Sequence, residues 1–168
     1  MPISIFKNTF STEQAIVSVE GILSGIKNGR WAEQILRLRS LSPEEYKKEK
    51  THLPAVTWAG VFSERVDAAI TEYSGVMCLD IDHIDSNKIT LIKSQLEQDE
   101  YCYFAFVSPS NEGLKVGFCI DTTSEFHLHA FLHLQKYFQE KYFVKVDDAG
   151  KNISRLCYVS YDELCYFN

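Results

Sequence analysis

The sequence predicts an α+β domain in which an antiparallel sheet follows a helical N-terminal segment. Three observations predict this class. Strand-like and helix-like segments follow each other in the order β-α-β-β-α-β between residues 75 and 161, a turn rich in Ser, Pro, Asn and Gly separates two consecutive strands, and the early part of the chain has helical spacing. A chain of 168 residues is long enough for one domain with a single buried core. We therefore expect residues 1–168 to form one domain.

The N-terminal segment is predicted to be mainly helical. Residues 12–50 carry apolar side chains at helical spacing, with Ser11 or Thr12 in the position of an N-cap. A second start signal follows at Ser42, because Pro43 stands at the first position of the helix that would begin there. We therefore expect more than one helix in this segment.

The pattern changes near residue 51. Residues 53–62 predict a short strand, and the apolar side chains within residues 66–73 predict a helix after it because they recur at helical spacing. The chain accordingly divides into a mainly helical extension, residues 1–50, and a sheet-containing core, residues 51–168.

The core is predicted to alternate strands with two amphipathic helices. In the first of these helices, Ile89, Ile92 and Leu96 lie on one face. The predicted elements are, in order, strand 75–82, helix 87–98, strand 101–108, strand 114–120, helix 124–142 and strand 155–161.

This order is the split βαβ arrangement of ferredoxin-like and RNA-recognition-motif folds. In that arrangement the first and third strands are antiparallel neighbours at the centre of the sheet, and the fourth strand lies on the other side of the first. The end of the first strand should therefore lie close to the start of the third strand and to the start of the last one.

Two carboxylates, Asp80 and Asp82, stand in the otherwise apolar strand "VMCLDID". Because strand side chains alternate, the two point to the same face, about 6.5 to 7 Å apart, while Leu79 and Ile81 point to the other. Adjacent carboxylates repel each other and lose hydration unless a cation or hydrogen bonds compensate. Oxygen ligands suit Mg²⁺ or Mn²⁺. The alternative is an exposed sheet face that displays Asp at alternate positions.

The turn "SPSNEGLK" is the second converging segment. Backbone amides near Gly113 and the hydroxyls of Ser108 and Ser110 could contact phosphate oxygens, and Lys115 is a point charge suited to phosphate. The alternative is a plain hairpin turn with a surface lysine. The third segment, "VDDAGKNISRL", offers another carboxylate and an arginine for phosphate, or else an acidic turn with a structural ion pair.

Composition is that of an ordinary globular protein. The hydrophobic fraction is 45%, and the five cysteines have no CxxC spacing, which argues against a zinc knuckle or a disulfide framework. The net charge of −6 does not give the global basic footprint of a nucleic-acid binder, although Lys and Arg outnumber Glu between residues 27 and 50. We interpret that segment as a solvated helical surface. With no secretory signal or spanning stretch, we expect a cytoplasmic protein without a membrane partner.

The segments "LDID", "SPSNEGLKVGF" and "VDDAGKNISRLCYVSYDE" together resemble the archaeo-eukaryotic primase, or primase-polymerase, superfamily. Within it, "LPAVTWAGVFSER" and "SRLCYVSYDELCYFN" are similar to the VirE-associated N-terminal domain family of bacterial mobile elements. The resemblance covers roughly residues 50–168. It implies that Mg²⁺ or Mn²⁺ is held by the catalytic residues Asp80, Asp82 and Asp147. It implies that nucleotide phosphates are bound by Ser108, Ser110, Gly113, Lys115 and Arg155.

The function that the resemblance implies is metal-dependent nucleotidyl transfer to a nucleic-acid 3′-hydroxyl, with DNA and nucleoside triphosphates as partners. The predicted strand close to Asn168 fits a domain that continues into a longer replication protein of a mobile element or plasmid, with a C-terminal helicase or ATPase domain. One departure concerns Lys115, where active members commonly have His. Asn111 also stands where Gly is often found.

Two other functions are open at this stage. A catalytically degenerate nucleic-acid or nucleotide-binding module would use the same sheet and the basic N-terminal segment without chemistry. A phosphatase of the haloacid dehalogenase type also places DxD at a strand end. That class needs a parallel, doubly wound sheet and usually Thr or Val where this chain has Ile84.

Overall fold

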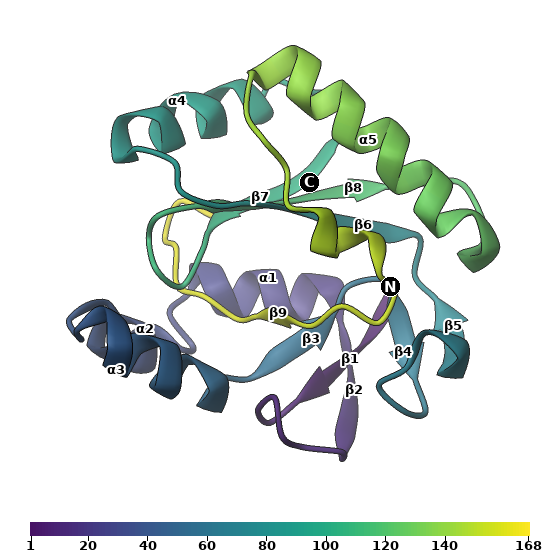
Figure 1. Cartoon of the computed structure of the whole chain (residues 1–168), viewed down its shortest axis with the longest axis horizontal. Helices are drawn as coiled ribbons and strands as arrows, with labels where there is room; N and C mark the ends of the chain where they lie inside the picture. The colour runs from purple at the N-terminus through teal and green to yellow at the C-terminus, as the bar shows by residue number, and fades with distance from the viewer.

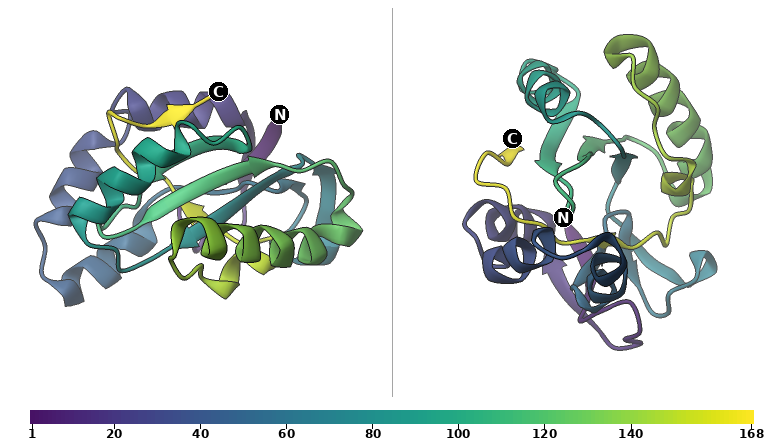
Figure 2. Two further views of the ribbon diagram at one scale, coloured as in Figure 1. Left: turned by 90° about the horizontal axis from the view of Figure 1, so that it is seen from above. Right: turned by 60° about the vertical axis from the view of Figure 1, so that its left-hand side comes forward.

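The computed structural model describes residues 1–168 and has a mixed α/β architecture with antiparallel sheets and five α-helices. Two four-stranded sheets form separate layers (Figure 1). Figure 2 shows α4 and α5 on the side of one sheet that faces away from α1, α2 and α3. None of the helices is long and apolar enough to cross a membrane.

The first sheet belongs mainly to the N-terminal part of the chain and has the order β2-β1-β3-β9. Its strands are β1 (Pro2–Phe6), β2 (Gln14–Ser18), β3 (Ala55–Thr57) and β9 (Cys157–Tyr158). The helices that accompany it are α1 (Val19–Lys27), α2 (Ala32–Arg39) and α3 (Pro43–Glu49), followed by the 3₁₀ turn η1 (Lys50–His52). The predicted start of α3 is confirmed, because Ser42 and Glu45 form a capping box with Pro43 in the first turn.

The second sheet has the order β10-β7-β8-β6. Its strands are β6 (Val76–Ile81), β7 (Cys102–Val107), β8 (Leu114–Cys119) and β10 (Tyr166–Phe167). The helices over its outer face are α4 (Ser86–Leu96) and α5 (His127–Tyr142) (Figure 1). The predicted antiparallel pairing of the first and third core strands is confirmed, and its register places Asp80 opposite Lys115.

The remaining elements are short. A two-stranded hairpin consists of β4 (Gly60–Phe62) and β5 (Ile70–Tyr73). Three further 3₁₀ turns are η2 (Asp67–Ala69), η3 (Ser124–Phe126) and η4 (Asp148–Lys151).

The core has two parts, one on each face of the second sheet. Leu79 and Ile81 of β6 pack with α4 and α5. Phe104 and Phe106 of β7 face the other way and pack with α1 and the first sheet. Because neighbouring strand residues point to opposite faces, Asp80 projects into the space between the two sheets.

Two element predictions in the N-terminal half were wrong. Residues 14–18 form β2 rather than a helical turn, and the helix N-cap is Ser18, whose hydroxyl accepts from the Gly21 N–H. The segment 66–73 contains η2 and β5 instead of a helix, because its backbone pairs with β4. In both places a strand pairing overrides a spacing that alone fits a helix.

The last predicted strand also differs. Only Cys157–Tyr158 is extended, and it pairs with β3 in the first sheet rather than with β6. The position beside β6 is occupied instead by the segment before η4, where the Asp147 N–H donates to the Asp80 carbonyl at 2.8 Å. As a result β6 is an edge strand of its sheet, and the RNA-recognition-motif order is not reproduced in full.

Candidate metal centre

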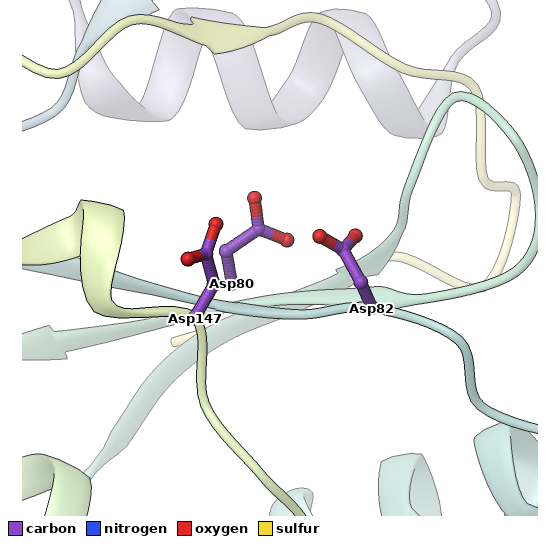
Figure 3. Close-up of side chains that lie close together, drawn as sticks. All are labelled: Asp80, Asp82 and Asp147. Carbon is purple, nitrogen blue, oxygen red and sulfur yellow. The ribbon is translucent and has the colours of Figure 1, made fainter.

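Three carboxylates meet at the end of β6. Each of Asp80, Asp82 and Asp147 offers an oxygen within 4.8 Å of the others. Figure 3 shows the three carboxyl groups pointing to the same side of the sheet, two from β6 and its continuation and one from the segment that leads into η4. All three donors are carboxylate oxygens, which suit a hard divalent cation such as Mg²⁺ or Mn²⁺.

Asp147 reaches this position through backbone interactions. Besides the N–H donated to Asp80, its own carboxylate accepts from the Ala149 N–H at 3.1 Å and so begins η4. Gly150 then lies against β6, where a side chain at its Cβ position would stand 3.2 Å from the Cys78 carbonyl and 2.8 Å from the Phe131 ring. Glycine at this position therefore allows η4 to pack closely on β6 and on the Phe131 ring.

Lys115 forms an ion pair with Asp80 across the strands. Its side chain is only 11% exposed, so the ammonium lies inside the protein rather than on the surface. Burial raises the pKa of Asp80, the Lys115 ion pair opposes that rise, and the neighbouring charges of Asp82 and Asp147 add to it. The other carboxylate oxygen of Asp80, Oδ1, is buried without a hydrogen-bond partner. A cation at this oxygen would compensate both effects.

Two thiols adjoin this ion pair. The neighbouring Cys78 thiol and the positive charge of Lys115 lower the pKa of Cys157 to about 7, against the effect of burial. Burial works to lower the pKa of Lys115, but Cys157 and Asp80 outweigh it, so the pKa of Lys115 lies above its ordinary value. Lys115 is therefore a permanent cation between an acidic and a sulfur group.

The structure separates the predicted phosphate-binding residues. Ser108 is buried, and its hydroxyl hydrogen-bonds to the Ser110 hydroxyl at 3.1 Å. Gly113 is packed against the backbone of β6, where a Cβ would lie 2.3 Å from the Ile81 carbonyl oxygen. Ser110 lines the cleft that contains Asp82. Of the predicted phosphate-binding residues of this turn, Ser110 is the one that lines the cleft, together with Glu112 from the same turn.

Arg155 lies beside Asp147. Its guanidinium is 3.9 Å from Asp147 Oδ2, and its side chain is 52% exposed. An exposed pair at this distance contributes little to stability. The guanidinium is thus open to an anionic ligand next to Asp147.

A model of the BT4734-like, N-terminal domain family matches residues 48–167. The chain belongs to that family. No curated protein and no solved structure matches the chain significantly. The matched region of this BT4734-like domain contains all three carboxylates, and it begins within α3, ahead of Lys50.

A cleft of about 570 Å³ lies between Asp82 of this cluster and the N-terminal helices of the BT4734-like domain. Its walls include Tyr46 and Lys50 from the end of α3 and from η1, Tyr158 from β9, and Asp82 and Ser110 from the second sheet. One signal for this wall is present in the sequence, the excess of cations between residues 27 and 50, which we interpreted as a solvated surface. For Lys50 that interpretation was wrong, because the side chain is half-buried at the cleft.

Proposed function

We propose that this chain is a primase-polymerase-like domain that transfers nucleotides to a nucleic-acid 3′-hydroxyl with the help of Mg²⁺ or Mn²⁺. The observation that carries the proposal is the meeting of Asp80, Asp82 and Asp147, together with the buried Asp80 Oδ1 that has no protein partner. An acidic DxD strand joined by a late acidic residue is the pattern of that superfamily.

The arrangement of β6, β8 and β7 also supports the proposal. These strands with α4 and α5 keep the order and pairing of the first three strands of a split β-α-β-β-α-β fold. In this interpretation the fourth strand has moved to the first sheet, and the segment before η4 delivers Asp147 in its place. The antiparallel sheet does not suit the remote phosphatase alternative, which requires a parallel doubly wound one.

In the proposed mechanism Asp80, Asp82 and Asp147 hold the metal, which when bound supplies activation of the hydroxyl and stabilisation of the pyrophosphate leaving group. Lys115 keeps Asp80 ionised by pairing with it, which opposes the rise in the pKa of Asp80 caused by burial. Arg155 is placed to neutralise a phosphate next to Asp147.

The test begins with Asp82→Asn. Asp82 is exposed and forms no ion pair, so Asp82→Asn removes a ligand without leaving a buried charge unpaired. Asp80→Ala, in contrast, would leave the buried Lys115 ammonium without its ion-pair partner. We expect calorimetry to show Mn²⁺ binding by the wild type, weakened at least about tenfold in Asp82→Asn. The control is Asp85→Asn, an exposed carboxylate outside the cluster, which should bind Mn²⁺ like the wild type. Equal affinity in all three proteins would refute a metal role.

Chemistry is tested by extension of a DNA primer on a template with deoxynucleoside triphosphates and Mn²⁺. We expect extension by the wild type and none by Asp82→Asn.

A second candidate, a catalytically degenerate nucleotide- or nucleic-acid-binding module, is favoured by one observation. The Lys115 ammonium already forms an ion pair with one carboxylate oxygen of Asp80, Oδ2, which is then less available to a metal ion. Under this alternative, nucleotide binding is retained and no primer is extended. Lys115→His would then be the variant to restore extension.

A further inference from the structure

We propose that the cleft between the end of α3 and the end of β6 binds the phosphate tail of a nucleoside triphosphate through Lys50. This inference rests on the proposed function and adds to it a residue from outside the three segments that resemble the superfamily. It also reassigns the phosphate contact, because Lys115 is buried and paired with Asp80.

Lys50 is held in a defined position without an acidic partner. Its ammonium lies 5.1 Å from the centroid of the Tyr158 ring and 5.8 Å from that of Tyr46, so two aromatic faces orient it. None of the ion pairs in the chain includes Lys50. A half-buried ammonium that has lost part of its hydration and has no ion-pair partner favours an anionic ligand.

The carboxylate end of the cleft acts on Lys50 at a distance. Burial lowers the pKa of Lys50, and the positive charge of Lys115 lowers it further. The charges of Asp80 and Asp82 act in the opposite direction. Lys50 is therefore within electrostatic reach of Asp80 and Asp82, although it comes from a different layer of the fold.

Two hydroxyls of the cleft suit the same ligand, whereas the Glu112 carboxylate that also lines the cleft does not. The Tyr46 hydroxyl is buried and makes no hydrogen bond of normal geometry, although the nearby Ser110 hydroxyl offsets part of the rise in pKa that burial causes. Both hydroxyls can donate to phosphate oxygens. Arg39 also lines the cleft, but its guanidinium donates to the carbonyls of Pro109, Ser108 and Tyr161 and is already engaged.

The chemistry of the two ends identifies the ligand class. One end has Asp82 of the carboxylate cluster, which suits a divalent cation. The other end has the Lys50 ammonium and two hydroxyls, which suit an anion. A polyphosphate satisfies both at once, because its oxygens can bind metal at one end and Lys50 at the other. A nucleoside triphosphate is the polyphosphate that the proposed transfer reaction consumes.

The test compares Lys50→Met with Lys48→Met. Methionine keeps the aliphatic stem beside the two rings and removes the charge, while Lys48 is exposed at the end of α3, two residues earlier, and does not line the cleft. Two probes are titrated calorimetrically in Mg²⁺, dATP and inorganic tripolyphosphate. We expect Lys50→Met to weaken both by about tenfold or more, and Lys48→Met to change neither by more than about twofold.

Further measurements separate the possible outcomes. Lys50→Arg keeps a cation and should retain most of the dATP affinity, which guards against a Lys50→Met variant that fails to fold. Wild-type affinity for both probes in Lys50→Met overturns the proposal, as does a loss confined to binding of a single-stranded DNA oligonucleotide. Mn²⁺ binding in the absence of nucleotide reports on the three carboxylates alone. If that binding is missing while Lys50→Met still loses tripolyphosphate, the proposed metal function fails and this inference stands.

Discussion

Gly113→Ala should damage the candidate site without touching a carboxylate. An ideal Cβ at position 113 would lie 2.3 Å from the Ile81 carbonyl oxygen and 3.2 Å from the Asp82 Cα. Since real Cβ contacts essentially never fall below 3.0 Å, the turn and the end of β6 must separate by about 0.7 Å. The movement falls on the backbone that carries Asp82.

The expected losses of unfolding free energy and of metal affinity follow from the contacts that this separation strains. The Ser108 N–H donates to the Gly113 carbonyl and closes the turn, and the Ile84 N–H donates to the Glu112 carbonyl and joins the turn to the segment after β6, each at 2.9 Å. The separation strains both bonds. Overpacking of this kind costs about 1 to 3 kcal/mol of unfolding free energy. Displacement of the support behind a metal ligand typically weakens metal binding by about 10- to 100-fold.

Urea unfolding and Mn²⁺ calorimetry measure the two effects. The matched control is Asn111→Gly in the same turn, where Asn111 already has a φ of 64°, a conformation that glycine adopts readily. We expect the control to stay within about 0.5 kcal/mol of the wild type and to keep its Mn²⁺ affinity. Wild-type stability and Mn²⁺ affinity in Gly113→Ala would show that the turn is not packed on β6 and that the reasoning is wrong.

Three more predictions concern groups outside the carboxylate cluster. Burial lowers the pKa of His127 from its ordinary 6.5, and its Nδ1 lies 3.0 Å from the Tyr73 hydroxyl. The unfolded chain therefore binds the proton more readily, and urea titrations should show stability falling as pH drops below about 6.5, a slope that His127→Gln lacks. Asp162→Asn leaves the buried Lys93 ammonium unpaired and should lower the unfolding free energy by about 3 kcal/mol, with Lys93→Met in the same background recovering part of it. Finally, Cys119 is the exposed thiol, so a thiol reagent should modify one cysteine rapidly in the native protein and all five after unfolding.

Local patterns predicted three of the four strands of the second sheet, β6, β7 and β8, whereas β10 was not predicted. The helices at residues 86–96 and 127–142, and the hairpin of β7 and β8, follow from spacings that are complete within a few turns of chain. The alternation of Leu79 and Ile81 with Asp80 similarly placed the carboxylate on the face away from α4 and α5. Such features depend on the period of the element and not on its partners.

Long-range pairings could not be predicted in the same way. The strand β9 has two residues, too few to show a period, and its partner β3 lies about a hundred residues earlier in the chain. The fourth-strand position was therefore assigned by analogy and was wrong. For the same reason the side of the cleft formed by Lys50 and Tyr158 was not predicted, because nothing in the sequence near Lys50 indicates that β9 brings Tyr158 beside it.

Strand register links the fold to the charge balance of the site. The close approach of Gly113 to Ile81 fixes where β8 begins against β6, and that start places Lys115 opposite Asp80. A slip of one residue would turn Lys115 to the face that α4 and α5 cover and would present an apolar neighbour in its place. With the observed register, three carboxylates and one buried ammonium leave a formal charge of −2, which one divalent cation balances. In the proposed reaction a second divalent ion would have to enter together with the triphosphate, because the carboxylates are already balanced by the first ion. Lys50, which has no ion-pair partner, would then balance part of the negative charge of the triphosphate at the far end of the cleft.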